Sequence, residues 1–204
     1  MRKFPLLLIL VICLASYVVP QSGRRVSTTT PAPTAPVQPP LNPEPEVRRE
    51  KPTPNVLLFL PESVLERRIR TLDDNASFRL ADFQGKVMVI NIWASWCGPC
   101  RREIPVYEKI RRDYAGRNVE FIALTPEDPA LATGRVNKFV RETGFSFRLG
   151  WADGETARVL MNGRGAIPQT LVIDNGGSII NHWAGYSSRE GDKRLRDALD
   201  GALK

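Results

Sequence analysis

The stretch Trp93-Ala-Ser-Trp-Cys-Gly-Pro-Cys100 decides the fold of this chain. The apolar run 87–93 before it predicts a buried central strand, and residues 99–114 after it predict a helix. A Cys-x-x-Cys pair at a strand-to-helix junction is typical of a thiol–disulfide redox site. The orphan backbone N–H groups and the dipole at a helix N-terminus favour a thiolate on the first sulfur. Cys97 is therefore the expected nucleophile, and Cys100 is the expected resolving cysteine.

Two other uses of a Cys-x-x-Cys pair compete with redox chemistry. A zinc site normally takes four protein ligands, or three and a water molecule, but the only further Cys or His residues are Cys13 and His182. A purely structural disulfide usually closes a longer loop, because its stabilisation grows with loop length. We favour the redox interpretation over both, and we expect no metal and no cofactor other than the disulfide.

Composition and charge limit the classes of function that the chain can have. The chain has 204 residues, room for one or two domains, and a formal net charge of +7. Seven basic and three acidic residues give the first 55 residues a charge of +4, which leaves only +3 for the remainder. A nucleic-acid-binding protein would carry its basic face on the folded domain, so we expect no nucleic-acid partner. Three cysteines do not make a disulfide scaffold.

The N-terminal segment has the layout of a signal peptide or signal anchor. Arg2 and Lys3 precede an almost wholly apolar run over residues 4–20. This run has about the minimum length that spans a bilayer as a helix, and the basic residues before it favour a cytoplasmic N-terminus. We therefore expect residues 1–22 to anchor an extracytoplasmic (periplasmic) domain to the membrane, or to be cleaved so that the domain is secreted. Lipidation at Cys13 is an alternative.

Residues 23–54 contain nine prolines among Thr, Ala, Glu and Arg residues. Such a segment buries too little apolar surface to fold and favours extended polyproline II conformation. We expect a disordered, Pro-rich linker that holds the following domain, residues 55–204, away from the membrane.

Hydrophobic patterning predicts the element order of residues 55–204. The turn Asp174-Asn-Gly-Gly177 is a strong hairpin signal. The predicted strands are 68–72, 77–80, 87–94, 119–124, 145–149, 170–173 and 178–183, and the predicted helices are 99–114, 130–143, 156–161 and 195–203. This order implies an α/β fold with a central mixed β-sheet flanked by helices on both faces.

Three stretches of the chain resemble the thioredoxin superfamily, and more closely its TlpA/ResA group of membrane-anchored proteins. They are the redox stretch continued by Glu103-Ile-Pro105, its entry Asp82–Trp93, and Gly165–Asp174, which is similar to the superfamily's cis-proline segment. The likeness runs from about residue 72 to 186. It implies a thioredoxin-like fold, and the group includes the reductants of cytochrome c maturation.

The resemblance also implies roles for individual residues. Cys97 would attack a substrate disulfide and Cys100 would resolve the intermediate. Pro168 would be cis and face the cysteine pair, although an ordinary turn proline is an alternative, and Ile167 would present backbone groups to the substrate. The expected substrate-binding residues are Trp96, Gly98, Pro99, Ile167 and Pro168.

Asn91 departs from thioredoxin, which has a buried aspartate at this strand position. Asparagine cannot take a proton, so another group must help to deprotonate Cys100. The resemblance points to Glu103, because the TlpA/ResA group has a functional glutamate three residues after the second cysteine. One helical turn places Glu103 near Cys100, and burial would raise its pKa toward the thiol range. A solvated helix glutamate is the alternative.

The sequence therefore predicts an extracytoplasmic thiol–disulfide oxidoreductase that reduces protein disulfides with the Cys97–Cys100 dithiol. Its expected partners are protein disulfide substrates and, from the resemblance, a membrane thiol reductase as electron donor. We expect a monomer. The alternatives are a disulfide oxidase or isomerase, and a redox-inactive tethered binding module. His182, the only histidine, is expected to be a strand surface residue.

Overall fold

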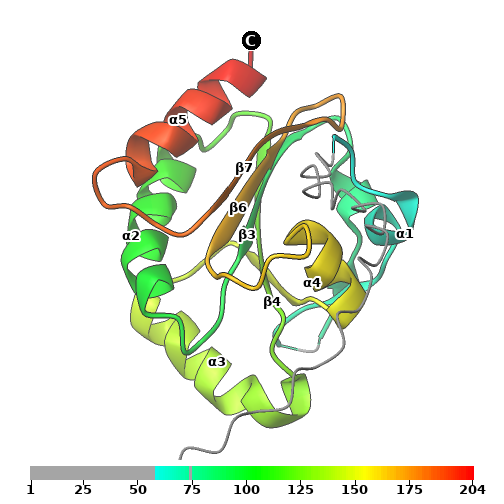
Figure 1. Cartoon of the computed structure of the whole chain (residues 1–204), viewed down its shortest axis with the longest axis vertical. Helices are drawn as coiled ribbons and strands as arrows, with labels where there is room; N and C mark the ends of the chain where they lie inside the picture. Colours follow the sequence, from blue (N-terminus) through cyan, green and yellow to red (C-terminus); the bar gives the residue numbers. More distant parts are fainter. Residues whose placement is uncertain (1–57, 74) are drawn as a thin grey trace, which may run out of the picture. The chain divides into compact units, whose positions relative to one another are not determined.

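The computed structural model describes residues 58–73 and 75–204 (Figure 1). The expected signal or anchor segment, the expected linker and the first residues of the expected domain lie outside the described residues. Within the part that is described, no helix is both long enough and apolar enough to cross a membrane.

A five-stranded mixed sheet forms the centre of the domain, with strand order β5-β4-β3-β6-β7. The strands are β3 (Val87–Ile92), β4 (Val119–Thr125), β5 (Arg148–Trp151), β6 (Gln169–Ile173) and β7 (Ile179–Ala184). Strands β3, β4 and β5 run parallel, whereas β6 pairs antiparallel with both β3 and β7. Every residue of β3 is buried, which explains its continuous apolar sequence. The predicted mixed sheet is confirmed.

Three helices cover one face of this sheet: α2 (Gly98–Asp113), α3 (Pro129–Thr143) and α5 (Gly191–Ala202). They lie together along one side of the strands in Figure 1. Their apolar faces share one core cluster with alternate residues of β3 and with Trp93, which directly follows that strand. The Trp93 ring stacks on Phe139 of α3 with ring centroids 4.8 Å apart. Trp93, Cys97 and Cys100 of the stretch 93–100 are thus part of this hydrophobic core.

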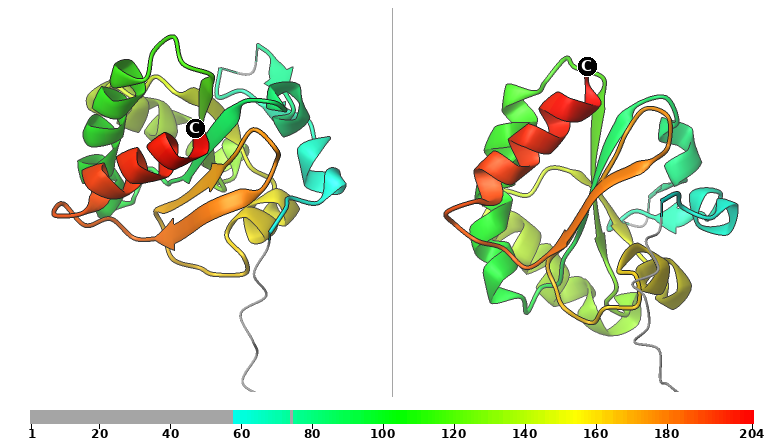
Figure 2. Two further views of the ribbon diagram at one scale, coloured as in Figure 1. Left: turned by 90° about the horizontal axis from the view of Figure 1, so that it is seen from above. Right: turned by 45° about the horizontal axis from the view of Figure 1, so that its top comes forward.

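Shorter elements cover the opposite face: α1 (Glu62–Leu65), the 3₁₀ helix η1 (Leu80–Phe83) and α4 (Gly154–Leu160). Strands β1 (Ile69–Arg70) and β2 (Ser77–Phe78) form a separate antiparallel hairpin. Figure 2 shows α1, β1 and β2, in cyan, beside the central sheet. The two faces together confirm a sheet with helices on both sides.

Each predicted strand differs from the structure by one to three residues at one or both ends, and two of these differences have a clear local cause. The strand expected over 145–149 forms over 148–151, because Gly144 ends α3 in the left-handed conformation and Phe145 still belongs to that helix end, its N–H bonding to the Val140 carbonyl at 3.2 Å. The strand expected over 77–80 stops at Phe78. The Asp82 carboxylate accepts the Arg79 N–H at 2.8 Å, which starts η1 instead.

Candidate active site

The two cysteines of the motif form a disulfide at the N-terminus of α2. Their Cα atoms are 5.3 Å apart. Cys97 is the N-cap residue of the helix, and its Sγ accepts a hydrogen bond from the Cys100 backbone N–H at 3.1 Å. Pro99 occupies the first turn, where the missing N–H costs no hydrogen bond. The sulfur of Cys97 therefore faces the positive end of the helix, which favours a thiolate after reduction.

The two sulfurs differ in their access to solvent. Cys97 retains 3% exposure, whereas Cys100 has none. Trp96, directly before Cys97, is 67% exposed, and Gly98 is also exposed. Cys97 is thus the more accessible of the two cysteines, and its two sequence neighbours are exposed.

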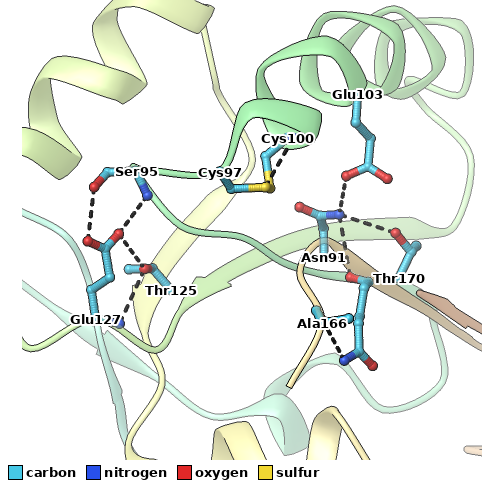
Figure 3. The surroundings of a disulfide bond; sticks show 10 residues. Asn91, Ser95, Cys97, Cys100, Glu103, Thr125, Glu127, Ala166 and Thr170 are labelled. Atoms are coloured by element: carbon cyan, nitrogen blue, oxygen red, sulfur yellow. Dashed lines mark hydrogen bonds between the residues drawn. A yellow bond between two sulfur atoms is a disulfide. The ribbon is translucent and has the colours of Figure 1, made fainter. Parts of the chain in front are cut away.

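Glu103 lies one helical turn after Cys100 and is fully buried. Its Oε2 accepts a hydrogen bond from Asn91 Nδ2 at 2.9 Å. The same amide group donates to Thr170 Oγ1 at 3.2 Å on the neighbouring strand β6. Figure 3 shows this polar group beside the disulfide. Glu103 is thus buried, as expected, and more completely than a partly buried residue would be. The alternative of a solvated helix glutamate is wrong.

Burial raises the pKa of Glu103 to about 7, and contacts with the Asn91 amide and the Tyr107 hydroxyl only partly offset that rise. Among the described residues, no group makes a hydrogen bond of ordinary geometry to Glu103 Oε1. This carboxyl group therefore titrates near neutral pH, and it has one oxygen available for a proton.

The predicted cis-proline segment leads directly into strand β6, whose Thr170 accepts a hydrogen bond from Asn91. The Ile167–Pro168 peptide bond is cis, the geometry that the resemblance implies. Ile167 is half-buried and packs against the core cluster that includes both cysteines. The Gln169 side chain is fully buried and its Nε2 donates to the Ala166 carbonyl at 2.7 Å.

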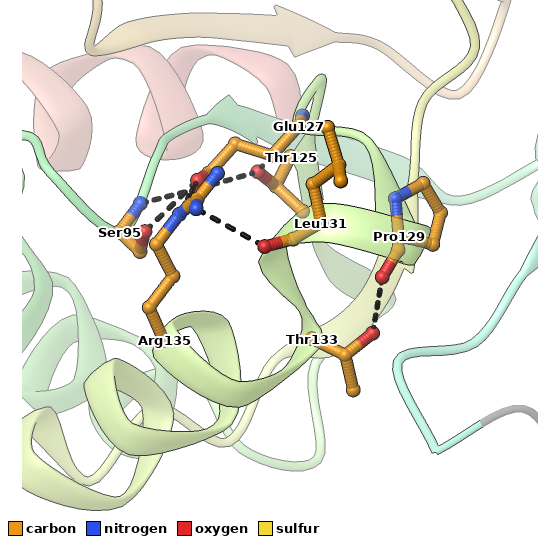
Figure 4. A network of polar contacts seen from close by, with 7 residues as sticks. All are labelled: Ser95, Thr125, Glu127, Pro129, Leu131, Thr133 and Arg135. Carbon is orange, nitrogen blue, oxygen red and sulfur yellow. Dashed lines mark hydrogen bonds and ion pairs between the residues drawn. The ribbon is translucent and has the colours of Figure 1, made fainter.

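A second polar network, on the other side of the disulfide, holds the loop that leads into Cys97. Glu127, in the loop between β4 and α3, accepts hydrogen bonds from the Ser95 N–H at 2.6 Å and from Ser95 Oγ at 2.9 Å (Figures 3 and 4). Thr125 Oγ1 and Arg135 Nε donate to the same carboxylate at 3.3 and 2.9 Å. Burial alone would raise the pKa of Glu127, but the hydrogen bonds from Ser95 and the charge and hydrogen bond of Arg135 lower it below its ordinary value. The Glu127 carboxylate is thus ionised, and it holds the loop that leads into Cys97 through its hydrogen bonds with Ser95.

Some residues of the site were not found from the sequence. Glu127 and Gln169 bear on the redox loop and on the cis-proline segment through contacts across the fold. His182 is half-buried rather than a surface residue, and its Nε2 lies 2.8 Å from Gln169 Oε1. No local pattern marks these residues as part of the site: Glu127 and Gln169 lie next to the ends of predicted strands, and His182 lies inside one. Across the described residues, no cluster of three or more His, Cys, Asp or Glu side chains is suited to hold a metal ion.

Comparisons with known proteins agree with this geometry. The family model described as Redoxin matches residues 51–199. The chain is 31% identical over 121 residues to the thiol-disulfide oxidoreductase ResA of Geobacillus thermodenitrificans, which covers 59% of this chain and 67% of that protein. Among solved structures, a putative thiol:disulfide interchange protein DsbE from Chlorobium tepidum is similar with a TM-score of 0.60 and 24% identity, covering 68% and 93% of the two chains.

A second similar structure is a putative protein disulfide isomerase from Bacteroides thetaiotaomicron, with a TM-score of 0.57 and 27% identity over 67% of this chain and 85% of that one. The thioredoxin-like fold, the disulfide at the start of α2 and the match over residues 51–199 place the chain in the Redoxin family. Within that family it is a thiol–disulfide oxidoreductase whose redox pair is Cys97 and Cys100.

Proposed function

We propose that this domain reduces disulfides of other proteins on the extracytoplasmic side of a membrane, to which the N-terminal segment tethers it. The observation that carries the proposal is the pairing of the α2 disulfide with Glu103, a buried carboxyl group of pKa about 7 one turn further along the helix. A dithiol that acts as a reductant needs a proton acceptor for its second cysteine, and Glu103 meets that need.

The reaction starts from the reduced pair. The Cys97 thiolate attacks one sulfur of the substrate disulfide, forms a mixed disulfide with it and releases the other substrate sulfur as a thiolate. The Cys100 thiol then loses its proton and attacks Cys97 Sγ, which releases the second substrate sulfur. Two electrons pass to the substrate, and the enzyme is left with the disulfide seen in the structure.

Glu103 takes part in the second attack. Cys100 is fully buried, so bulk water does not take its proton directly. An ionised Glu103, one turn away on the same helix, accepts that proton, and a pKa near 7 makes the transfer efficient at neutral pH. Asn91 holds the carboxylate in place through Oε2.

The substrate and the electron donor follow from the resemblance to the TlpA/ResA group. Trp96, Gly98, Pro99, Ile167 and Pro168 would contact the substrate chain, and apocytochrome c is the substrate class that this group suggests. A membrane thiol reductase would return electrons to the Cys97–Cys100 disulfide. The domain would act as a monomer, with no cofactor other than this disulfide.

A trapping experiment tests the proposed mechanism. In the Cys100→Ser full chain, Cys97 can attack a disulfide but nothing resolves the product. Incubation with insulin, a protein that carries disulfides, should give a covalent adduct that dithiothreitol releases. The matched Cys97→Ser variant should give none, because Cys100 is buried. An adduct in the Cys97→Ser variant, or in neither variant, would contradict the proposed order of attack.

A further inference from the structure

The cis-proline segment is held by one buried side chain, Gln169. Its Nε2 donates to the carbonyl of Ala166 at 2.7 Å and to that of Arg164 at 3.3 Å. Its Oε1 lies 2.8 Å from His182 Nε2. The amide group is fully buried and uses both of its ends. It therefore connects the exposed part of the segment, residues 164–166, to strand β7.

These contacts fix the orientation of the amide and the tautomer of the imidazole. The two backbone carbonyls can only accept, so the NH₂ end of Gln169 must face them. Its Oε1 then faces His182 and can also only accept, so His182 Nε2 must carry a proton. Burial and the nearby positive charge of Arg164 lower the pKa of His182, which keeps the ring neutral at pH 7 with this proton in place.

The pairing is a cross-strand contact on one face of the sheet. Gln169 is in register with Ala184 on β7, so His182, two residues earlier, is its diagonal neighbour. The next residue, Thr170, faces the opposite side and contacts Asn91 at 3.2 Å. Figure 3 shows the contact between Asn91 and Thr170 beside the disulfide. The start of β6 is thus tied to the redox centre on one face and to His182 on the other.

We propose that His182 is a positioning residue for substrate binding: through Gln169 it holds the segment 164–168 in the shape that receives a substrate chain. This inference rests on the proposed function, in which Ile167 and Pro168 contact the substrate. Removal of the imidazole leaves Gln169 Oε1 buried without its donor, and the amide is then free to turn away from the Ala166 and Arg164 carbonyls. The segment loses its shape, while the cysteine pair, held by α2, does not.

The test separates protein substrates from small ones. The reduced full chain is mixed with increasing insulin, or with bis(2-hydroxyethyl) disulfide, and oxidation of the dithiol is followed by tryptophan fluorescence. In His182→Ala, the insulin concentration for half-maximal rate should rise roughly 3- to 10-fold. The limiting rate and the rate with the small disulfide should stay as in the wild type. His182→Gln, whose amide can donate to Gln169, should restore the wild-type value.

Asn181→Ala is the matched control, because Asn181 is the exposed neighbour of His182 on β7. Unchanged insulin saturation in His182→Ala would overturn the inference, and so would equal slowing with both disulfides, which would place the effect at the redox centre or in the fold. If the wild type itself does not reduce insulin, the proposed function fails rather than the role of His182. A circular dichroism melt of each variant shows whether the fold is intact.

Discussion

The backbone N–H of Ser95 donates a hydrogen bond to Glu127 Oε2 at 2.6 Å, although the two residues are 32 positions apart. Ser95 lies two residues before Cys97, whereas Glu127 lies just before α3. The same carboxylate binds Arg135 on that helix. The loop that leads into the redox pair is therefore fixed to α3 by a buried charge, and not only by its packing around Trp93.

Replacement of Glu127 by alanine should destabilise the domain by about 2–4 kcal/mol, because several buried donors lose their acceptor at once. Glu127→Gln should lower the free energy of unfolding by less, since its amide oxygen can still accept a hydrogen bond from Ser95. Urea unfolding at pH 7 measures both. The control is Glu142→Ala, which removes an exposed ion pair with Arg101 worth about 0–1 kcal/mol. Equal losses in Glu127→Ala and Glu142→Ala would refute the role of the network.

The same network should make stability depend on pH in acid. The pKa of Glu127 is lowered in the folded protein, so its contribution is present above the unfolded pKa of about 4.5. It is lost as pH falls through the folded pKa. The difference in unfolding free energy between the wild type and Glu127→Gln should shrink between pH 5 and pH 3, as measured by urea unfolding. A constant difference across this range would argue against an ionised Glu127.

Glu103→Gln should slow insulin reduction by roughly tenfold or more at pH 8, because glutamine cannot take the Cys100 proton. In the wild type, the rate should rise as pH increases through about 7, where Glu103 ionises, and the variant should lose that step. Glu108→Gln is the control, since Glu108 is another buried glutamate of α2 and bonds Ser146 instead. A pH profile that keeps the step near 7 in Glu103→Gln would assign it to another group.

The buried Glu103 should also cost stability at alkaline pH. Its folded pKa of about 7 is above its ordinary value of 4.5, so the stabilising contribution is complete below pH 4.5 and is lost as pH rises through 7. Glu103→Gln should therefore be more stable than the wild type at pH 8, by roughly 1–3 kcal/mol, and similar to it at pH 4. Thermal unfolding at the two pH values checks this, and a variant that is less stable at pH 8 would contradict it.

Trp96→Ala should weaken binding of protein substrates without affecting the fold. The side chain is 67% exposed beside Cys97, so its removal should change the unfolding free energy by no more than about 0.5 kcal/mol. The insulin concentration for half-maximal rate should rise severalfold. Leu131→Ala is the control, since Leu131 is 75% exposed on α3. If both variants raise the half-maximal insulin concentration equally, Trp96 does not contribute specifically to substrate binding.

The features that sequence could predict are those with a local cause. The apolar run of β3, the Cys-x-x-Cys pair and the helix after it define the centre of the fold, because strand, N-cap and first turn are encoded by adjacent residues. The hairpin of β6 and β7 follows from the Asn-Gly turn that joins them. The disulfide between Cys97 and Cys100 follows from the same short stretch.

What sequence could not predict depends on contacts between distant residues. Glu127 can contact Ser95 only when β4 and β3 pair, because Glu127 follows the end of β4 and Ser95 follows the end of β3. The partnership of His182 with Gln169 depends on the register of β7 against β6. The bounds of the strand expected over 145–149 were wrong because Gly144 ends α3 in the left-handed conformation and the Phe145 N–H still bonds to the Val140 carbonyl of that helix.

The reduction potential of the Cys97–Cys100 pair in the full chain tests the central claim most directly. Equilibration with dithiothreitol and glutathione buffers, followed by alkylation of free thiols, gives this value. A dedicated reductant should lie in the reducing half of the range between thioredoxin, at about −270 mV, and the oxidant DsbA, at about −120 mV. A value near that of DsbA would contradict the account and indicate a disulfide oxidase or isomerase instead.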